Sequence, residues 1–221
     1  MKLSESTLSL LKNFTEINQS ILFKHGTKLR TMSVMKNILA EATVDEEFPK
    51  DFGIYDLQQF MNGLRLYQSP ELDFSNESYV VIREGKSNTK YFFADAAIIA
   101  SPPDKPISLP SEDVSFVLTS QHLDRLKKSS SLLQLPDISA IGEDGVVRLV
   151  VRDKKNDTSN KFSIEVGETD KVFTCNFKEE NLKLIEGSYD VAISSKLLSR
   201  FQSKNYDLTY YIALEPDSTF E

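Results

Sequence analysis

Apolar residues recur at steps of three and four positions in four short segments of the chain, and this spacing predicts amphipathic helices. In residues 4–17, Leu8 and Phe14 belong to such a stripe, and Ser4 or Ser6 is suited to cap the first backbone N–H groups. The other predicted helices cover residues 54–67 with Asp56 as cap, 119–134 with Ser120 as cap, and 177–186, which Gly187 follows. Their expected buried residues are Leu57, Phe60, Met61, Leu64, Leu123, Leu126, Leu133, Leu182 and Ile185.

Short runs rich in Val, Ile, Tyr, Phe and Thr lie between these segments and predict β-strands. Asp144-Gly145 follows Glu143 at the centre of two such runs, which is typical of a tight hairpin turn. The predicted strands cover residues 21–23, 28–33, 38–44, 71–74, 79–83, 90–94, 114–118, 138–141, 146–152, 161–166, 172–177, 189–193, 197–202 and 206–214.

Four prolines fall within residues 101–110, where they prevent a helix or a central strand because each lacks an N–H and fixes φ. We therefore expect an extended connector over residues 102–110 between two domains, residues 1–101 and 111–221. Both halves repeat the same order of elements. The sequence predicts an α+β fold of two similar domains, each with two helices on antiparallel sheets.

Composition narrows the class of protein. The chain has 221 residues, a formal net charge of −7 and a single cysteine. No apolar run is long enough to span a membrane, and the N-terminal residues do not resemble a secretory signal. We expect a soluble, intracellular protein, and its negative charge alone argues against a conventional nucleic-acid binder.

Residues suited to catalysis are few. His25 lies beside a turn glycine and His122 near a helix start, so structural roles are expected for both, and Cys175 fits a buried packing position. The triplet at residues 85–87, Gly-Lys-Ser, lacks the earlier glycine of a phosphate-binding loop, because Val80 occupies that position. The sequence offers no Cys/His cluster with metal-ligand spacing, so we expect neither an enzyme nor a cofactor.

The predicted helices hold equal numbers of basic and acidic residues, so the rest of the chain carries the whole net charge of −7. Most of the acids lie in first turns, where the helix dipole favours them. The basic residues lie largely opposite the apolar stripe, which by itself is typical of a solvated face. They are Lys12, Arg65, Arg125, Lys127, Lys128, Lys178 and Lys183.

Several segments resemble the DNA polymerase sliding clamps of T-even-type phages. The matches run from residue 1 to 219 in the order of that family. They are Met1-Lys2-Leu3-Ser4, Leu10-Leu11-Lys12-Asn13-Phe14 with Ile17-Asn18, Ala40-Glu41-Ala42, Ile54-Tyr55-Asp56-Leu57 with Phe60, Lys105-Pro106-Ile107 with Pro110, and residues 211–219 from Tyr211 to Thr219.

The resemblance implies a DNA clamp fold and a homotrimer that closes a pseudo-six-fold ring around double-stranded DNA, with the helices on its inner face. Such a ring would make the phage polymerase processive without reading bases. Its contact with DNA would be topological and only weakly electrostatic, because the helix charges sum to zero. The implied DNA-facing residues are Lys2, Lys12, Arg65, Arg125, Lys127, Lys128, Lys178 and Lys183.

The resemblance also implies partners: the phage DNA polymerase, a clamp-loader complex and late transcription factors, in the cytoplasm of the infected bacterial host. An apolar pocket beside the connector would receive their tails. Subunits are expected to join by pairing residues 90–94 of one copy with residues 161–166 of the next. The expected partner-binding residues are Ile107, Leu109, Leu214 and Pro216.

Three alternatives remain open from the residues alone. An acidic α+β adaptor would bind proteins without encircling DNA. An acidic mimic of DNA would need an extended stripe of carboxylates, whereas here they are dispersed among lysines. An enzyme of an unrecognised type is the third.

Overall fold

The computed structural model describes residues 1–221, which form two compact units. The N-terminal unit comprises Met1–Lys105 and Tyr206–Leu208, and the C-terminal unit comprises Pro106–Asn205 and Thr209–Glu221. Residues 101–113 contain neither helix nor strand. None of the helices has the length and apolar character needed to cross a membrane.

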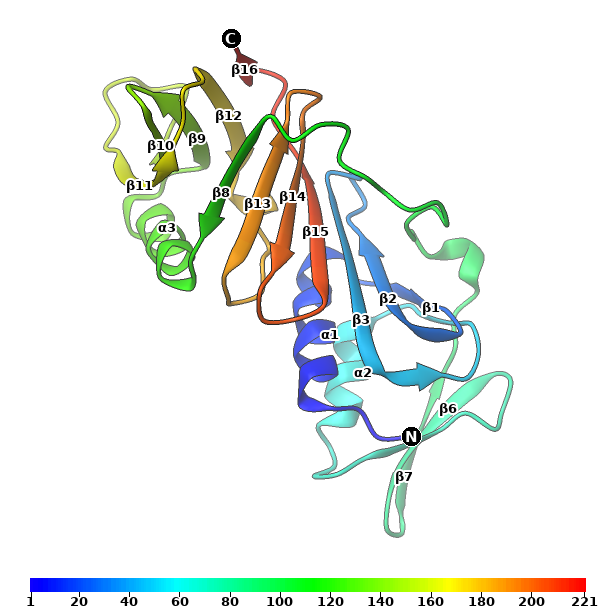
Figure 1. Ribbon diagram of the computed structural model, residues 1–221. Coiled ribbons are helices and arrows are strands. Elements are labelled where there is room, and N and C mark those ends of the chain that lie inside the picture. Colours follow the sequence, from blue (N-terminus) through cyan, green and yellow to red (C-terminus); the bar gives the residue numbers. More distant parts are fainter. The chain divides into compact units, whose positions relative to one another are not determined.

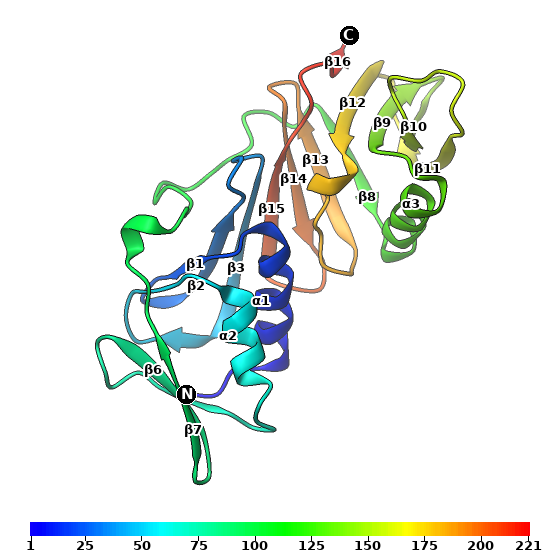
Figure 2. The same ribbon diagram turned by 180° about the vertical axis from the view of Figure 1, so that it is seen from behind.

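In the N-terminal unit, α1 (Glu5–Ile17) and α2 (Leu57–Leu64) pack side by side, and α1 also packs on strands β2 and β3 (Figures 1 and 2). Strand pairing is antiparallel throughout, in the groups β1-β4, β2-β3 and β5-β6-β7. The bounds are β1 Ile21–Phe23, β2 Gly26–Met32, β3 Ile38–Phe48, β4 Phe52–Ile54, β5 Glu71–Asp73, β6 Tyr79–Glu84 and β7 Ser87–Phe92, followed by a 3-10 turn, η1, Ala96–Ile98.

Both helices of this unit have a cap that the sequence predicts, but α2 is shorter than the predicted residues 54–67, because Ile54 ends strand β4 and the helix ends at Leu64. The Ser4 hydroxyl accepts a hydrogen bond from the Thr7 N–H at 3.2 Å, and the Asp56 carboxylate accepts one from the Gln59 N–H at 2.8 Å. All four residues predicted to be buried in α2 are buried. Leu8 is different, because it is only half-buried and lines a surface pocket.

An aromatic cluster fills the core next to β1 and β4. The rings of Phe23 and Phe52 stack with centroids 4.5 Å apart, and Phe48 packs on Phe23 at 4.8 Å. Strand β4 is absent from the predicted set, because Gly53 lies at its centre and its last residue, Ile54, falls within the predicted helix. Its burial on both sides comes from this tertiary packing.

In the C-terminal unit, α3 (Ser120–Leu133) packs on β10 and β11 of a sheet with the order β11-β10-β9-β12-β16 (Figure 1). Strands β15, β14, β13 and β8 pair antiparallel in that order. The bounds are β8 Val114–Leu118, β9 Asp137–Glu143, β10 Val146–Arg152, β11 Phe162–Glu168, β12 Phe173–Lys178, β13 Tyr189–Ser194, β14 Leu198–Ser203, β15 Leu208–Ala213 and β16 Thr219–Phe220.

The predicted hairpin turn between β9 and β10 is confirmed. Glu143 pairs with Val146, and the two residues between them both have positive φ, 53° at Asp144 and 83° at Gly145. Two consecutive positive φ values define the type I′ turn, whose twist matches that of the flanking strands.

The predicted second helix of this half, residues 177–186, is wrong. Strand β12 continues to Lys178, which pairs with Asp137, and only a 3-10 turn, η2 (Glu179–Asn181), follows. Leu182 and Leu184 are then buried alternately, which is the pattern of extended chain, and the predicted core residue Ile185 is half-buried. The C-terminal unit therefore has one α-helix where two were predicted.

Two details of α3 also differ from the prediction. Its cap is Thr119, whose hydroxyl accepts from the His122 N–H at 3.1 Å, so Ser120 is the first helical residue. Leu133, predicted to be buried, is 41% exposed. The apolar stripe ends earlier because Gln134 adopts the left-handed conformation that turns the chain back toward the sheet.

Candidate functional site

The eight cations predicted to face DNA differ in whether the protein already provides them with a partner. Lys2, ahead of α1, donates a hydrogen bond to the Ser69 hydroxyl at 3.0 Å and lies 3.9 Å from the Glu71 carboxylate. Its charge is therefore partly balanced within the N-terminal unit.

Two lysines of α3 have partners within the C-terminal unit. Lys127 is half-buried, and its ammonium donates to the Leu184 carbonyl at 2.8 Å. Lys128 forms an ion pair with Asp124, one turn earlier, at 2.8 Å. Because this pair is exposed it contributes little to stability, but the nearby carboxylate lowers the positive potential that Lys128 presents to solvent.

Lys178 and Lys183 do not lie on a helix. Lys178 ends β12, and its ammonium lies 2.6 Å from the carboxylate of Asp137, which is 1% exposed. The hydrogen bond to Asp137 raises the pKa of Lys178, so this lysine serves to compensate a buried carboxylate. Lys183 is half-buried in the irregular segment after η2.

The remaining three candidates, Lys12, Arg65 and Arg125, are exposed, and their side-chain nitrogens form no hydrogen bond or ion pair with the protein. The Arg125 guanidinium lies over the ring of Phe162, 5.2 Å from its centroid, where the cation–π interaction orients it without cancelling its charge. These three are the cations that remain available to an anionic ligand.

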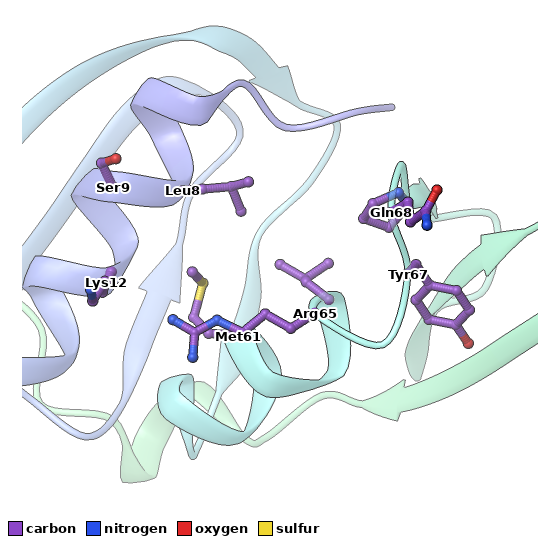
Figure 3. A pocket seen from close by; sticks show the side chains of 9 residues that line it. Leu8, Ser9, Lys12, Met61, Arg65, Tyr67 and Gln68 are labelled. Atoms are coloured by element: carbon purple, nitrogen blue, oxygen red, sulfur yellow. The ribbon is translucent and has the colours of Figure 1, made fainter.

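Lys12 and Arg65 line the same pocket of the N-terminal unit, between α1 and α2 (Figure 3). Arg65 follows the last turn of α2, and its side chain extends across Met61 toward the α1 side, where Lys12 lies. The pocket has a volume of about 250 Å³ and no carboxylate in its lining. It is lined by Leu8, Ser9, Lys12, Met61, Leu64, Arg65, Tyr67, Gln68 and Pro70.

The four residues predicted to bind partners all belong to the C-terminal unit. The Tyr211 hydroxyl donates to the Ile107 carbonyl at 2.8 Å and so holds the connector at that point. Leu214 is 6% exposed, which leaves it little surface for a partner. Ile107 and Leu109 are half-buried and Pro216 is exposed, so these three offer the accessible apolar surface.

Most of each segment predicted to join subunits lies in an edge strand, β7 or β11, but Ala94 pairs with Gly53 instead. Strand β7 ends the group β5-β6-β7, and β11 ends the sheet of the C-terminal unit. Phe92, the last residue of β7, is 66% exposed. An edge strand has unpaired backbone groups that another strand can bind.

A group of ionic residues that the sequence did not indicate fastens the C-terminal segment. The Lys154 ammonium lies 2.8 Å from Asp217 and 3.7 Å from Glu215, and the side chain of Lys154 is only 11% exposed. The Asn176 N–H donates to the Ser218 hydroxyl at 3.0 Å. No short motif links these residues, since their proximity depends on the pairing of β9, β10 and β12.

Comparisons with known proteins find a matching family for each half of the chain. Residues 2–100 match the family described as DNA polymerase processivity factor, and residues 115–216 match that described as gp45 sliding clamp, C terminal. The sliding clamp of Vibrio phage KVP40 is 34% identical over 97% of this chain and 99% of its own length.

Solved structures of similar fold include other clamps. The proliferating cellular nuclear antigen of Entamoeba histolytica aligns with a TM-score of 0.72 at 15% identity, over 97% of each chain. A. fulgidus PCNA, solved with the C-terminal region of FEN-1, aligns with a TM-score of 0.67 at 14% identity, over 96% of each chain. These likenesses show the clamp fold, and with the two family matches they establish that the chain belongs to the sliding-clamp family of DNA polymerase processivity factors.

Proposed function

We propose that this protein forms a homotrimeric ring around duplex DNA and tethers the phage replicative polymerase to its template. The observation that carries the proposal is the 34% identity to a phage sliding clamp over 97% of the chain. Such extended similarity, with both family matches in the same order, concerns the whole architecture rather than a single shared motif.

In this proposal the ring holds DNA by topology. Its basic residues add only weak contacts, which do not fix the register of the duplex. The distribution of charge along the chain supports this view. Lys12, Arg65 and Arg125 lie on or at the ends of helices, whereas the chain as a whole has a net charge of −7. Weak, sequence-independent contacts with phosphates allow sliding, since they carry no information about bases.

Polymerase, clamp loader and late transcription factors would dock on the accessible apolar residues beside the connector, Ile107, Leu109 and Pro216. The binding of a partner's C-terminal region to a clamp of similar fold, that of A. fulgidus, supports a docking mode of this kind. The protein itself would catalyse no reaction, and it would act in the cytoplasm of the infected host.

The proposal is tested by primer extension with the phage polymerase, its clamp loader and ATP, using excess unlabelled template so that each product reports one binding event. Addition of this protein should lengthen the products, and omission of the loader should abolish the gain. Unchanged product length would favour the acidic adaptor instead.

Sedimentation equilibrium tests the ring itself. A trimer has three times the 25.1 kDa mass of the chain. A strictly monomeric protein at high concentration would contradict a stable ring.

A further inference from the structure

We infer that the hydroxyl of Tyr211 positions the surface on which the apolar C-terminal tail of the phage polymerase docks. It holds the connector at Ile107 and thereby sets where the neighbouring Leu109 meets that tail. Tyr211 is a positioning residue, since its hydroxyl acts through the connector and does not itself bind the partner. The inference rests on the proposed function, which it deepens by naming a bond on which the affinity for the tail depends.

Residues 104–110 of the connector are held by a single hydrogen bond, the one that the Tyr211 hydroxyl donates to the Ile107 carbonyl at 2.8 Å. No other hydrogen bond and no ion pair involves this segment. Pro106 and Pro110 lack an N–H group, and the segment contains no strand that pairs with the sheet. The position of the middle of the connector therefore depends on this one directional contact.

The chain is held more firmly directly after this segment. The Ser111 hydroxyl lies 2.7 Å from the Ser194 hydroxyl. The Ser195 N–H donates to the Asp113 carboxylate at 2.7 Å. Because these bonds join different pairs of residues, the loss of one leaves the other in place. Residues 104–110 have no such second bond.

Tyr211 and Arg200 lie opposite each other on β15 and β14, so their side chains point to the same face of the sheet. Tyr211 holds the connector at Ile107. Arg200 holds the chain at Glu112, through an ion pair of 2.7 Å. Two points of the chain are therefore tied to neighbouring positions on one sheet. The residues between them, which include Leu109, have little freedom to move along the sheet.

The Tyr211 hydroxyl contributes more to docking than to folding. Ile107 is half-buried at the surface, where water can replace the hydroxyl as the donor to its carbonyl. Loss of the hydroxyl therefore changes the stability of the fold little. It leaves the connector more conformations in the free protein, and binding of the tail has to restrict them again, which lowers the affinity.

A direct bond from the Tyr211 hydroxyl to the tail fits less well. A hydroxyl has one proton to donate, and this one is donated to the Ile107 carbonyl. A tail that used the hydroxyl as its donor would have to break the bond that holds the connector. Docking on apolar side chains leaves that bond intact.

The test is the binding of a fluorescently labelled peptide with the C-terminal sequence of the phage polymerase, measured by anisotropy with the whole protein. In Tyr211→Phe, which removes only the hydroxyl, we expect the Kd to rise about fivefold to tenfold, the usual effect of one lost hydrogen bond. Tyr67→Phe is the matched control, because it removes a hydroxyl that lies 2.8 Å from that of Thr89 in the N-terminal unit. Its Kd should equal that of the wild type.

A spin label reports on the connector in the free protein. Ser108 is exposed, so Ser108→Cys accepts a nitroxide label, whereas Cys175 is buried and does not compete for it. Without peptide, the label should be more mobile when Tyr211→Phe is added and unchanged when Tyr67→Phe is added. Bound peptide should reduce the mobility in all three proteins. Thermal unfolding checks that each variant is folded.

Three results would overturn the inference. An unchanged Kd in Tyr211→Phe would mean that the bond to Ile107 does not position the docking surface. A raised Kd with unchanged mobility of the label would mean that the hydroxyl binds the tail itself. Equal losses of affinity in Tyr211→Phe and Tyr67→Phe would mean a general effect of removing a hydroxyl.

Failure of the proposed docking gives a different pattern from failure of this inference. If the tail does not dock beside the connector, Leu109→Ala binds the peptide as the wild type does, or the wild type does not bind it. If only the role of Tyr211 is wrong, the wild type binds the peptide and Leu109→Ala weakens binding, while Tyr211→Phe has the wild-type Kd.

Discussion

Gly142 illustrates how a single residue is fixed by its neighbour across a sheet. It lies in β9 opposite Phe173 of β12, and a Cβ at this position would meet the Phe173 ring and lie 2.7 Å from the Lys171 carbonyl oxygen. Phe173 is 2% exposed, so its ring lies within the packed interior. The position therefore requires glycine because of close packing rather than because of a positive φ.

We predict that Gly142→Ala lowers the free energy of unfolding by about 1–3 kcal/mol, the usual cost of overpacking a tight site. Gly167→Ala is the matched control, since a Cβ there would meet only the Phe116 Cβ at 3.8 Å. Urea unfolding at one protein concentration measures both variants. Equal stability of the two alanine variants would show that the Phe173 ring moves aside at little cost.

Asp113 gives a prediction about pH. The hydroxyl of Ser111 donates to its carboxylate at 2.6 Å and the Ser195 N–H donates at 2.7 Å, and these bonds lower the pKa of Asp113 to about 2. Because the pKa is lower in the folded protein, the carboxylate stabilises the fold above about pH 4, and this contribution is lost as the pH falls toward 2.

The difference in unfolding free energy between the wild type and Asp113→Asn should be constant above about pH 5 and shrink between about pH 4 and pH 2. Asp104→Asn, in the exposed connector, controls for the loss of one charge. A difference that stays the same down to pH 2 would contradict the account of these hydrogen bonds.

The sequence indicates which side chains are buried or charged, but it does not show which residues they contact. Cys175 was predicted to be a packing residue and is fully buried, where desolvation raises the pKa of its thiol to about 12. For the predicted helix cations, the sequence did not show which of them have an ionic partner. Lys178 has the same charge as Lys12, yet it compensates buried Asp137, a residue 41 positions away in sequence.

At the scale of elements, the C-terminal segment is held by side chains as well as by backbone pairing. Strand β16 has only two residues, and beyond it the Glu221 N–H donates to the Val172 carbonyl at 3.0 Å. So short a strand has little stability of its own, and we infer that Lys154, through Asp217 and Glu215, fixes the segment.

Lys154→Met should loosen this segment, because it leaves two carboxylates close together without their cation. We expect hydrogen exchange at the Glu221 and Asn176 amides to accelerate roughly tenfold, while exchange within β9 and β10 stays unchanged. Lys155→Met, an exposed neighbour without an ionic partner, is the control. Exchange in Lys154→Met at the wild-type rate would mean that backbone pairing alone holds the segment.

Prediction of elements succeeded where the signal was local. The caps Ser4 and Asp56 and the Asp144-Gly145 turn act within a few residues, so the sequence sufficed to place them. It failed at residues 177–186, where Phe177 and Lys178 pair with β9 and a 3-10 turn follows them. Long-range strand pairing outweighs the weak helical preference of so short a segment.

At the scale of the whole molecule, the sequence pattern predicted two halves of the same class, and the family supplied the expectation of a ring. Strands β7 and β11 each end a sheet, as a ring built by edge pairing requires. The predicted contact between them is one between two copies of the chain, which a single sequence could not show.

The same holds for the candidate site. The cations of the helices could be identified from the sequence, but the convergence of Lys12 and Arg65 on one pocket depends on how α1 and α2 pack. If the protein encircles DNA, its retention depends on the closure of the DNA rather than on affinity.

The measurement that tests encirclement of DNA most directly is retention of the labelled protein on DNA. The protein is loaded with the clamp loader and ATP, and free protein is then removed. On a closed circle the protein should remain bound, and it should be lost once a restriction enzyme linearises the circle. Equal retention on both forms would contradict encirclement.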